Sequence, residues 1–158
     1  FLAAAATLAY AVFAQYGQLF EPCPLCIFQR VAMAAVALFG LAGALHNPRS
    51  RGGRMAWGLL AFAAAAVGAA IAGRHVWLQH LPPDQVPACG PTLAYMVDSM
   101  PSWLAVVKKV LSGSGECAEV NWTLFGFSMP EWTLLCFVLL ATGALVAGFR
   151  RAGRASAA

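Results

Sequence analysis

The sequence predicts an all-α membrane protein, a four-helix transmembrane bundle with one long outer loop, and three observations lead to this fold class. The chain is 61% hydrophobic and only 10% charged, whereas soluble domains carry about 25% charged residues. Apolar stretches of 18 or 19 residues occur four times, at 1–19, 27–45, 55–73 and 132–149. At 1.5 Å per residue each covers roughly 27–29 Å, close to the hydrocarbon thickness of a bilayer. We expect residues 1–158 to form a single integral membrane domain.

The stretches at 1–19 and 55–73 are rich in alanine, so buried helices of a soluble protein remain an alternative for them. The first stretch also contains Ala9-Tyr10-Ala11, which resembles a signal-cleavage pattern. Its 19 uncharged residues exceed the usual signal core of about 7–15 residues, so we predict a span instead. The length shared by all four stretches favours four transmembrane helices.

The second helix is expected to begin at a cysteine pair. Prolines flank Cys23, and proline suits the first turn of a helix, which places Cys23-Pro24-Leu25-Cys26 at a helix N-terminus. Asn47-Pro48 ends this helix, and Gly52-Gly53 completes an inner turn. The third helix is expected to end at about Gly73.

The outer loop is expected at about 74–131, and loops of such length are usually functional. It contains Cys89 among prolines and Cys117 after Ser112-Gly113-Ser114-Gly115. Apolar residues recur at helical spacing over 101–111. We predict there a short amphipathic helix on the membrane surface. A helix packed on the loop's own small core is the alternative.

The basic residues set the predicted orientation. Arginines fill the link between the second and third helices and the C-terminal tail: Arg49, Arg51, Arg54, Arg150, Arg151 and Arg154. All acidic residues fall on the opposite side: Glu21, Asp84, Asp98, Glu116, Glu119 and Glu131. By the positive-inside rule both termini are cytoplasmic, and every cysteine except Cys136 lies outside or at the outer boundary. The net charge of +4 therefore indicates topology rather than nucleic-acid binding.

The Cys23 and Cys26 pair suits redox chemistry best. Haem attachment needs a histidine directly after the second cysteine, where Ile27 stands. Zinc needs two further ligands at matched spacing, and no second Cys-x-x-Cys or His-x-x-x-His pattern is present, so we predict no metal site. A helix N-terminus favours a reactive thiolate. A structural disulfide is the alternative, although so small a ring constrains little of the unfolded chain.

Arg30 lies one helical turn after Cys26 and shares its face. It can hold a thiolate or donate hydrogen bonds to a bound carbonyl, or it can be a snorkelling anchor. A bond between Cys89 and Cys117 can be structural or exchangeable. His80 can bind a quinone or simply lie at the surface. Cys136 is expected to be an inert buried thiol, and the other two histidines, His46 and His75, receive no role.

These residues make the chain closely resemble the bacterial DsbB family, the membrane enzymes that reoxidise DsbA. The matching segments are Cys23-Pro24-Leu25-Cys26-Ile27-Phe28-Gln29-Arg30, Ser114-Gly115-Glu116-Cys117-Ala118-Glu119 and Met129-Pro130-Glu131-Trp132. A Cys-x-x-Cys alone is weak, but this ordered set is highly specific and the resemblance covers nearly the whole chain.

The resemblance implies a relay in the bacterial inner membrane. Cys89 and Cys117 match the outer disulfide that accepts electrons from a DsbA-like partner. Cys23 and Cys26 match the membrane-proximal pair, with Cys26 facing quinone, ubiquinone or menaquinone. Arg30 matches an arginine that supports quinone binding, and His80 aligns less clearly with a histidine near it. The competitors are a thiol enzyme related to vitamin K epoxide reductase and a non-enzymatic protein with a four-cysteine metal site.

Overall fold

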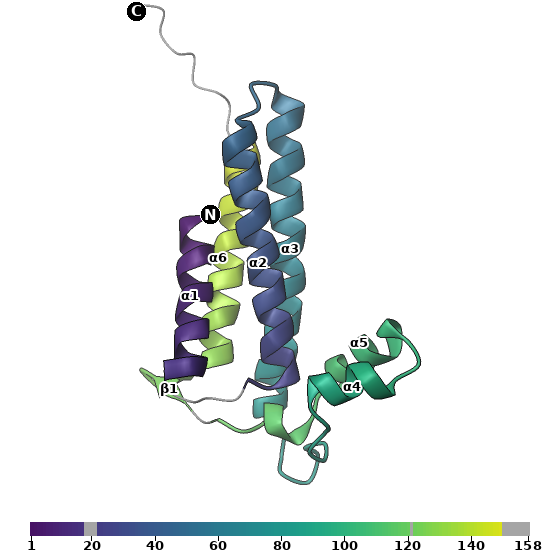
Figure 1. Cartoon of the computed structure of the whole chain (residues 1–158). Helices are drawn as coiled ribbons and strands as arrows, with labels where there is room; N and C mark the ends of the chain where they lie inside the picture. The colour runs from purple at the N-terminus through teal and green to yellow at the C-terminus, as the bar shows by residue number, and fades with distance from the viewer. Residues whose placement is uncertain (18–21, 121, 150–158) are drawn as a thin grey trace, which may run out of the picture.

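The computed structural model describes residues 1–17, 22–120 and 122–149, and it confirms an all-α membrane bundle (Figure 1). Four helices run side by side in the bundle, and two short ones lie beyond one of its ends. The helices are α1 (Leu2–Gly17), α2 (Pro24–His46), α3 (Arg51–Gln79), α4 (Leu93–Ser99), α5 (Trp103–Ser112) and α6 (Met129–Phe149). The bundle consists of α1, α2, α3 and α6.

Three of the bundle helices are long and apolar enough to cross a membrane: α2 with 23 residues, α3 with 29 and α6 with 21. The helix α1 is a shorter apolar helix of 16 residues that packs against α2. The expected end of the first span at 18–19, the adjoining residues Phe20 and Glu21, and the basic tail from Arg150 lie outside the described residues.

The structure confirms that the second helix begins at the cysteine pair, but the expected end of the third helix is wrong. Instead of stopping at Gly73, α3 continues to Gln79. A buried stripe of α3 continues into this extension: Ile71 before it and His75 and Leu78 within it are 8%, 3% and 0% exposed. These spacings of four and three residues place them on one stripe, so packing continues the helix past its apolar stretch. The helix α6 likewise begins at Met129 rather than at 132.

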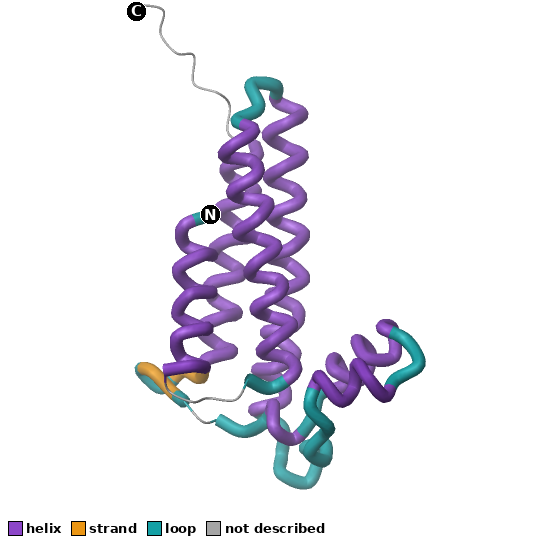
Figure 2. The backbone as a smooth tube through the Cα atoms, in the orientation of Figure 1, coloured by secondary structure: helices purple, strands orange, loops and turns teal. Residues whose placement is uncertain are grey.

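The outer connection therefore covers 80–128 and contains more structure than expected (Figure 2). Besides α4 and α5 it has a 3₁₀ helix at Gly115–Cys117 and a hairpin of β1 (Thr123–Leu124) with β2 (Phe127–Ser128). The two turn residues, Phe125 and Gly126, have φ values of 54° and 84°. Positive φ at both positions is typical of the hairpin turn whose twist matches its strands.

The amphipathic helix of the outer connection is confirmed as α5, which packs one face onto the bundle. Val106 and Val110 are each 2% exposed and join a core cluster with Leu25 of α2 and Leu78 of α3. At the start of α5, Trp103 remains 69% exposed. The valine face is thus covered by the end of the bundle as well as by the loop, and contact of the exposed end with a membrane surface stays a prediction.

Arg74 joins α5 to α3. Its Nε donates to the carbonyl of Leu111 at 3.2 Å, and its Nη2 donates to the carbonyl of Ser112 at 3.0 Å. These carbonyls lie at the C-terminus of α5, where a helix lacks internal donors and favours a cation. The guanidinium also lies 4.1 Å from the ring centroid of Trp77. A single side chain thereby satisfies one helix end and fixes the outer connection to the bundle.

Small residues allow α3 and α6 to approach closely. A Cβ on Gly58 would lie 2.8 Å from the Cα of Gly148, and a Cβ on Gly68 would collide with the ring of Phe137. Phe137 is fully buried in the core cluster between the helices. Lipid tails are as apolar as these side chains, so close packing rather than hydrophobic exclusion holds such helices together.

We expect Gly68→Ala to destabilise the bundle by about 1–3 kcal/mol, because Phe137 must leave its packed position. Thermal unfolding of the purified protein in detergent measures the change. Gly73→Ala is the matched control on the same helix, because a Cβ there meets nothing within 4 Å and alanine is the better helix former. Equal stability of the two variants would contradict the close-packing explanation.

Candidate active site at the cysteine pair

The cysteine pair occupies the first turn of α2. Cys23 is the N-cap residue, with φ −65° and ψ 161°, and Pro24 begins the helix. The two Sγ atoms lie 3.3 Å apart, and both thiols are free. Helix N-termini present unpaired N–H groups and the positive end of the helix dipole. Both sulfurs are therefore placed where a negative charge is favoured and where a disulfide can close.

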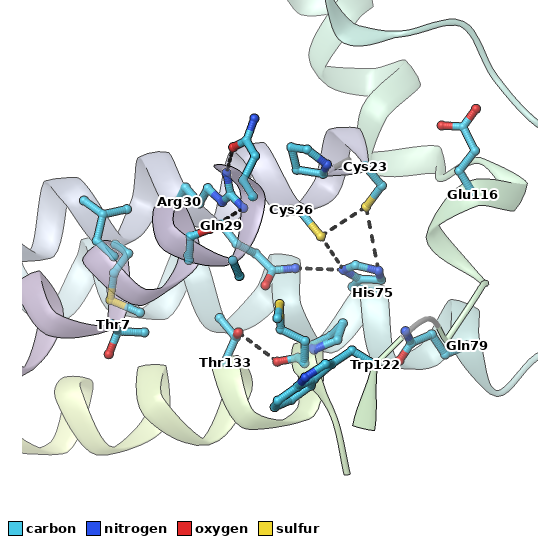
Figure 3. A pocket seen from close by; sticks show the side chains of 18 of the residues that line it. Thr7, Cys23, Cys26, Gln29, Arg30, His75, Gln79, Glu116, Trp122 and Thr133 are labelled. Carbon is cyan, nitrogen blue, oxygen red and sulfur yellow. Dashed lines mark hydrogen bonds between the residues drawn. The ribbon is translucent and has the colours of Figure 1, made fainter. Parts of the chain in front are cut away.

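The pair opens into a pocket lined by residues of α1, α2, α3, α6 and the outer connection (Figure 3). Its volume of about 140 Å³ far exceeds the roughly 10–15 Å³ that one water needs. Most of the exposed lining surface is apolar and is interrupted by polar side chains, as in sites for small organic ligands. These polar groups include Gln15 of α1, Gln29 and Arg30 of α2, and His75 of α3.

Arg30 lines the pocket and binds α1. Its Nη2 donates to the carbonyl of Ala11 at 2.9 Å, and its Nη1 donates to Oε1 of Gln15. An arginine in a membrane helix needs such partners, because an unpaired guanidinium is costly there. The side chain is thus satisfied by a neighbouring helix within the bundle, which differs from a snorkelling anchor.

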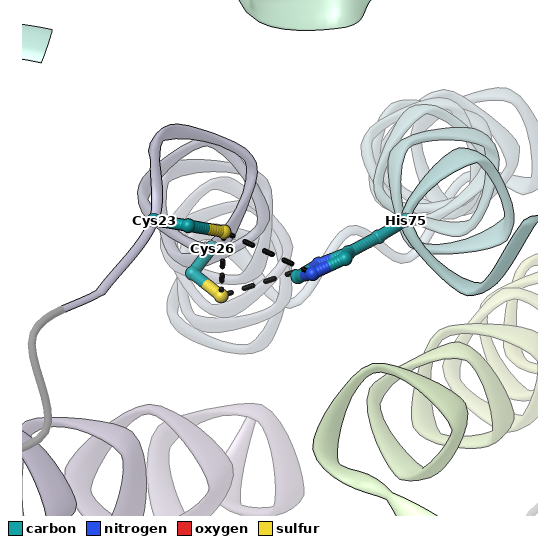
Figure 4. A group of neighbouring side chains, drawn as sticks. All are labelled: Cys23, Cys26 and His75. Carbon is teal, nitrogen blue, oxygen red and sulfur yellow. Dashed lines mark hydrogen bonds between the residues drawn. The ribbon is translucent and has the colours of Figure 1, made fainter. Parts of the chain in front are cut away.

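His75 is the histidine that the structure brings to the cysteine pair (Figure 4). Its Nε2 lies 3.8 Å from the Sγ of Cys23, and its Nδ1 lies 4.0 Å from the Sγ of Cys26. The amide nitrogen of Gln29 lies 3.0 Å from the same Nδ1. His75 and Gln29 are 3% and 5% exposed, so both polar side chains depend on these contacts.

His80 lies elsewhere. It caps the C-terminus of α3, is exposed, and donates from Nδ1 to the carbonyl of Val76 at 2.8 Å. It is not among the residues that line the pocket. His75 received no role from the sequence, because a third helix that ends at Gly73 leaves His75 in a loop. A usable signal was present, since His75 continues the apolar stripe from Ile71 to Leu78.

The two outer cysteines have different surroundings. Cys89 is exposed, whereas Cys117 is 1% exposed and packs in the same cluster as Cys23. The backbone N–H of Gly115 donates to the carbonyl of Ala88 at 3.2 Å, so the two cysteine segments adjoin. The pKa of Cys117 is raised. The largest cause is the hydrogen bond with the Cys23 side chain, and the second is burial of the thiol. Cys117 thus lies between the exposed Cys89 segment and the pair on α2.

Comparison with known proteins identifies the family of the chain. The family model described as "Disulfide bond formation protein DsbB" matches residues 1–147. A disulfide bond formation protein B of Xanthomonas campestris is 51% identical over 97% of this chain and 88% of its own length. A protein of the same name from Methylococcus capsulatus is 52% identical over 92% and 88%, and one from Acinetobacter baumannii is 48% identical over 88% and 81%.

A helical membrane bundle with a free cysteine pair at a helix N-terminus defines the class of membrane thiol–disulfide proteins. Within that class, the chain belongs to the DsbB family. It is therefore a membrane protein of disulfide bond formation, with the role of a disulfide oxidoreductase. Cys23, Cys26 and Arg30, expected from the sequence to serve this role, meet in one pocket.

The raised pKa of Cys117 predicts slow alkylation of the reduced protein at this residue. Only a thiolate reacts, so the rate should keep rising with pH well above about 8.5, the ordinary pKa of a cysteine. Mass spectrometry after timed iodoacetamide treatment follows each cysteine separately. Cys23→Ala should shift the pH profile of Cys117 to lower pH, because it removes the first cause of the raised pKa. An unchanged profile in this variant would contradict that cause.

Proposed function

We propose that this protein is a quinone-dependent thiol oxidase of the bacterial inner membrane. It reoxidises a periplasmic DsbA-like dithiol protein and passes two electrons through two cysteine pairs to quinone. The observation that carries the proposal is the position of Cys117, buried against Cys23, while Cys26 lines the adjoining pocket. This arrangement supports a continuous path for disulfide exchange from the outer connection to the membrane.

The relay begins at the exposed Cys89. With both pairs oxidised, a partner thiolate attacks Cys89, forms a mixed disulfide and releases the Cys117 thiolate. Cys117 attacks Cys23, which forms a bond between them and releases the Cys26 thiolate. The second partner thiolate then releases Cys89 from the mixed disulfide, and Cys89 attacks Cys117 to free Cys23. The partner dithiol is oxidised, the outer disulfide is restored, and the pair on α2 holds two electrons.

The pocket fits a quinone by its chemistry. Quinone, when bound, supplies an acceptor for two electrons and two protons. Apolar walls suit its ring, and a guanidinium donates hydrogen bonds well to a carbonyl oxygen. Arg30 would hold the ligand, and Cys26 would face it. We assign the role of the histidine near the quinone to His75 instead of His80, because His75 lines the pocket and His80 does not. A buried imidazole beside the sulfurs can hold or release a proton there.

The proposed orientation places the cysteines in the periplasm and both termini in the cytoplasm. The link from α2 to α3, with its arginines, lies at the opposite end of the bundle from Cys23 and the outer connection (Figure 1). The positive-inside rule assigns that arginine-rich end to the cytoplasm. In bacteria, disulfides persist on the other side of the membrane. Membership of the DsbB family argues against the vitamin K epoxide reductase alternative.

Quinone reduction by the purified protein in detergent, with a reduced DsbA-like protein as donor, tests the proposal. Wild type should turn over, and Cys26→Ser should lose activity by at least a thousandfold, because no dithiol can form on α2. Cys136→Ser is the matched control: this cysteine packs against the core cluster outside the pocket and should leave activity unchanged. Inactive wild type, given quinone and a competent donor, would refute the proposal.

The order of the relay predicts a selective effect of Cys89→Ser. Turnover with the DsbA-like donor should disappear, because no mixed disulfide can form on the exposed residue. A small dithiol should still support quinone reduction, since it can reach the half-buried Cys23 directly through the open pocket. Stopped-flow or steady-state absorbance of the quinone reports both reactions. Survival of turnover with the protein donor would show that the relay order is wrong.

A further inference from the structure

Three metal-ligating side chains converge at the helix N-terminus. The sulfurs of Cys23 and Cys26 and a ring nitrogen of His75 all lie within 4.8 Å of one another (Figure 4). Sequence spacing predicted no metal site, because the third ligand follows Cys23 by 52 residues and comes from another helix. Within the part of the chain that the structure describes, this is the one such group of three.

The distances approach those of a tetrahedral zinc site. With bonds of about 2.3 Å to sulfur and 2.05 Å to nitrogen, ligand atoms lie about 3.8 Å (S to S) and about 3.6 Å (S to N) apart. Here the sulfurs are 3.3 Å apart, and the Sγ of Cys23 is 3.8 Å from Nε2 of His75. The Sγ of Cys26 is 4.0 Å from the other ring nitrogen, Nδ1, and all three ligand atoms lie within 4.8 Å of one another, so shifts of about 1 Å complete the geometry. The fourth position opens into the pocket, where a water fits.

Gln29 provides the supporting hydrogen bond. A histidine that binds metal through Nε2 carries its proton on Nδ1 and donates it to a neighbouring acceptor. The buried Gln29 amide lies 3.0 Å from that Nδ1. A flip of the Gln29 amide exchanges its oxygen and nitrogen. Its Oε1 then accepts the hydrogen bond from the Nδ1–H of His75.

The local charges also suit a divalent cation. Two thiolates neutralise the metal, which removes the cost of a net buried charge. The other charged residues lining the pocket are Arg30, Glu116 and Glu119, one positive against two negative. The Arg30 guanidinium is already occupied by Ala11 and Gln15 of α1. Sulfur and imidazole ligands favour Zn²⁺ over Mg²⁺ or Ca²⁺.

We propose that the reduced Cys23–Cys26 pair and His75 form a zinc-binding site that exists only while the disulfide is open. Binding forms two S–Zn bonds and one N–Zn bond and releases the two thiol protons, with no change of oxidation state. Closing the disulfide gives up two electrons, which quinone accepts in the function proposed above, and converts both thiolates into a neutral bridge that removes two of the three ligands. Metal occupancy and the redox state of the pair therefore exclude each other.

The consequence for activity rests on the function proposed above. Zinc that binds only the dithiol form stabilises it, so the ratio of dithiol to disulfide rises by the factor 1 + [Zn²⁺]/Kd. The bound metal also occupies Cys26, the sulfur that faces the pocket. Zinc thus acts as an inhibitor that holds the relay in its reduced state until the metal is removed.

Cobalt binding tests the site without reference to activity. We would use the Cys89→Ser/Cys117→Ser variant, which retains all three ligands, reduced with a phosphine under anaerobic conditions in detergent. We expect one Co²⁺ per chain with the charge-transfer absorption of cobalt–thiolate bonds, and displacement of Co²⁺ by Zn²⁺. The same protein with its disulfide closed should bind no metal. Binding that survives closure, or no binding by the reduced protein, would overturn the proposal.

Variants in the same background identify the ligands. His75→Ala should weaken Co²⁺ binding at least tenfold, and Gln29→Leu should weaken it about 10–100-fold through the lost supporting hydrogen bond. His80→Ala and Cys136→Ser should leave affinity unchanged. An unaltered affinity in His75→Ala would refute the site. The comparison of open and closed disulfide needs no variant at His75, so it decides the proposal even where His75→Ala fails to fold.

Two measurements separate the zinc site from the quinone-linked relay. Quinone reduction by chelator-treated wild type reports the relay in the absence of metal. Turnover without cobalt binding by the reduced variant would refute the zinc site alone. Cobalt binding without turnover would refute the relay and leave the metal site standing.

Discussion

Polar side chains within an apolar bundle must satisfy one another, and this constraint shapes the site. Water is scarce at this depth, so an unpaired amide, imidazole or guanidinium costs several kcal/mol at most positions. Gln29 and His75 meet each other, and Arg30 meets the backbone and Gln15 of α1. Each contact joins two different helices. The functional groups are therefore held by the same interactions that fix the helices relative to one another around the cysteine pair.

The helix α3 carries most of this organisation. It contacts both α2 and α6, and Gly68 lets Phe137 pack into its surface. Two residues beyond the core residue Ala72, Arg74 binds the end of α5, and the adjacent His75 turns inward to the cysteine pair. The six residues by which α3 exceeds its expected length connect the membrane core, the active site and the outer connection. An extended helix thus replaces a flexible loop where exchange between cysteine pairs needs fixed positions.

Membership of the DsbB family and the local geometry explain different things. The family establishes a role in disulfide bond formation. The geometry adds an exposed Cys89 and a buried Cys117 beside Cys23, and the proposed relay rests on this arrangement. The same nearness of soft ligands that suits electron transfer also suits a thiophilic metal. In the zinc site proposed above, metal and disulfide compete for the same two cysteines, Cys23 and Cys26.

The sequence by itself determined the features that depend on local composition and spacing. Apolar length predicted α2 and α6 to within about three residues but ended α3 six residues early, and the prolines beside Cys23 predicted the start of α2. Only the tertiary structure selected His75 over His80, brought Cys117 against Cys23, and supplied a partner for Arg30. These pairings join residues from different helices, and their geometry depends on how the helices pack. Periodicity within one segment reports which face of a helix is apolar, but it does not report which polar group another helix places against that face.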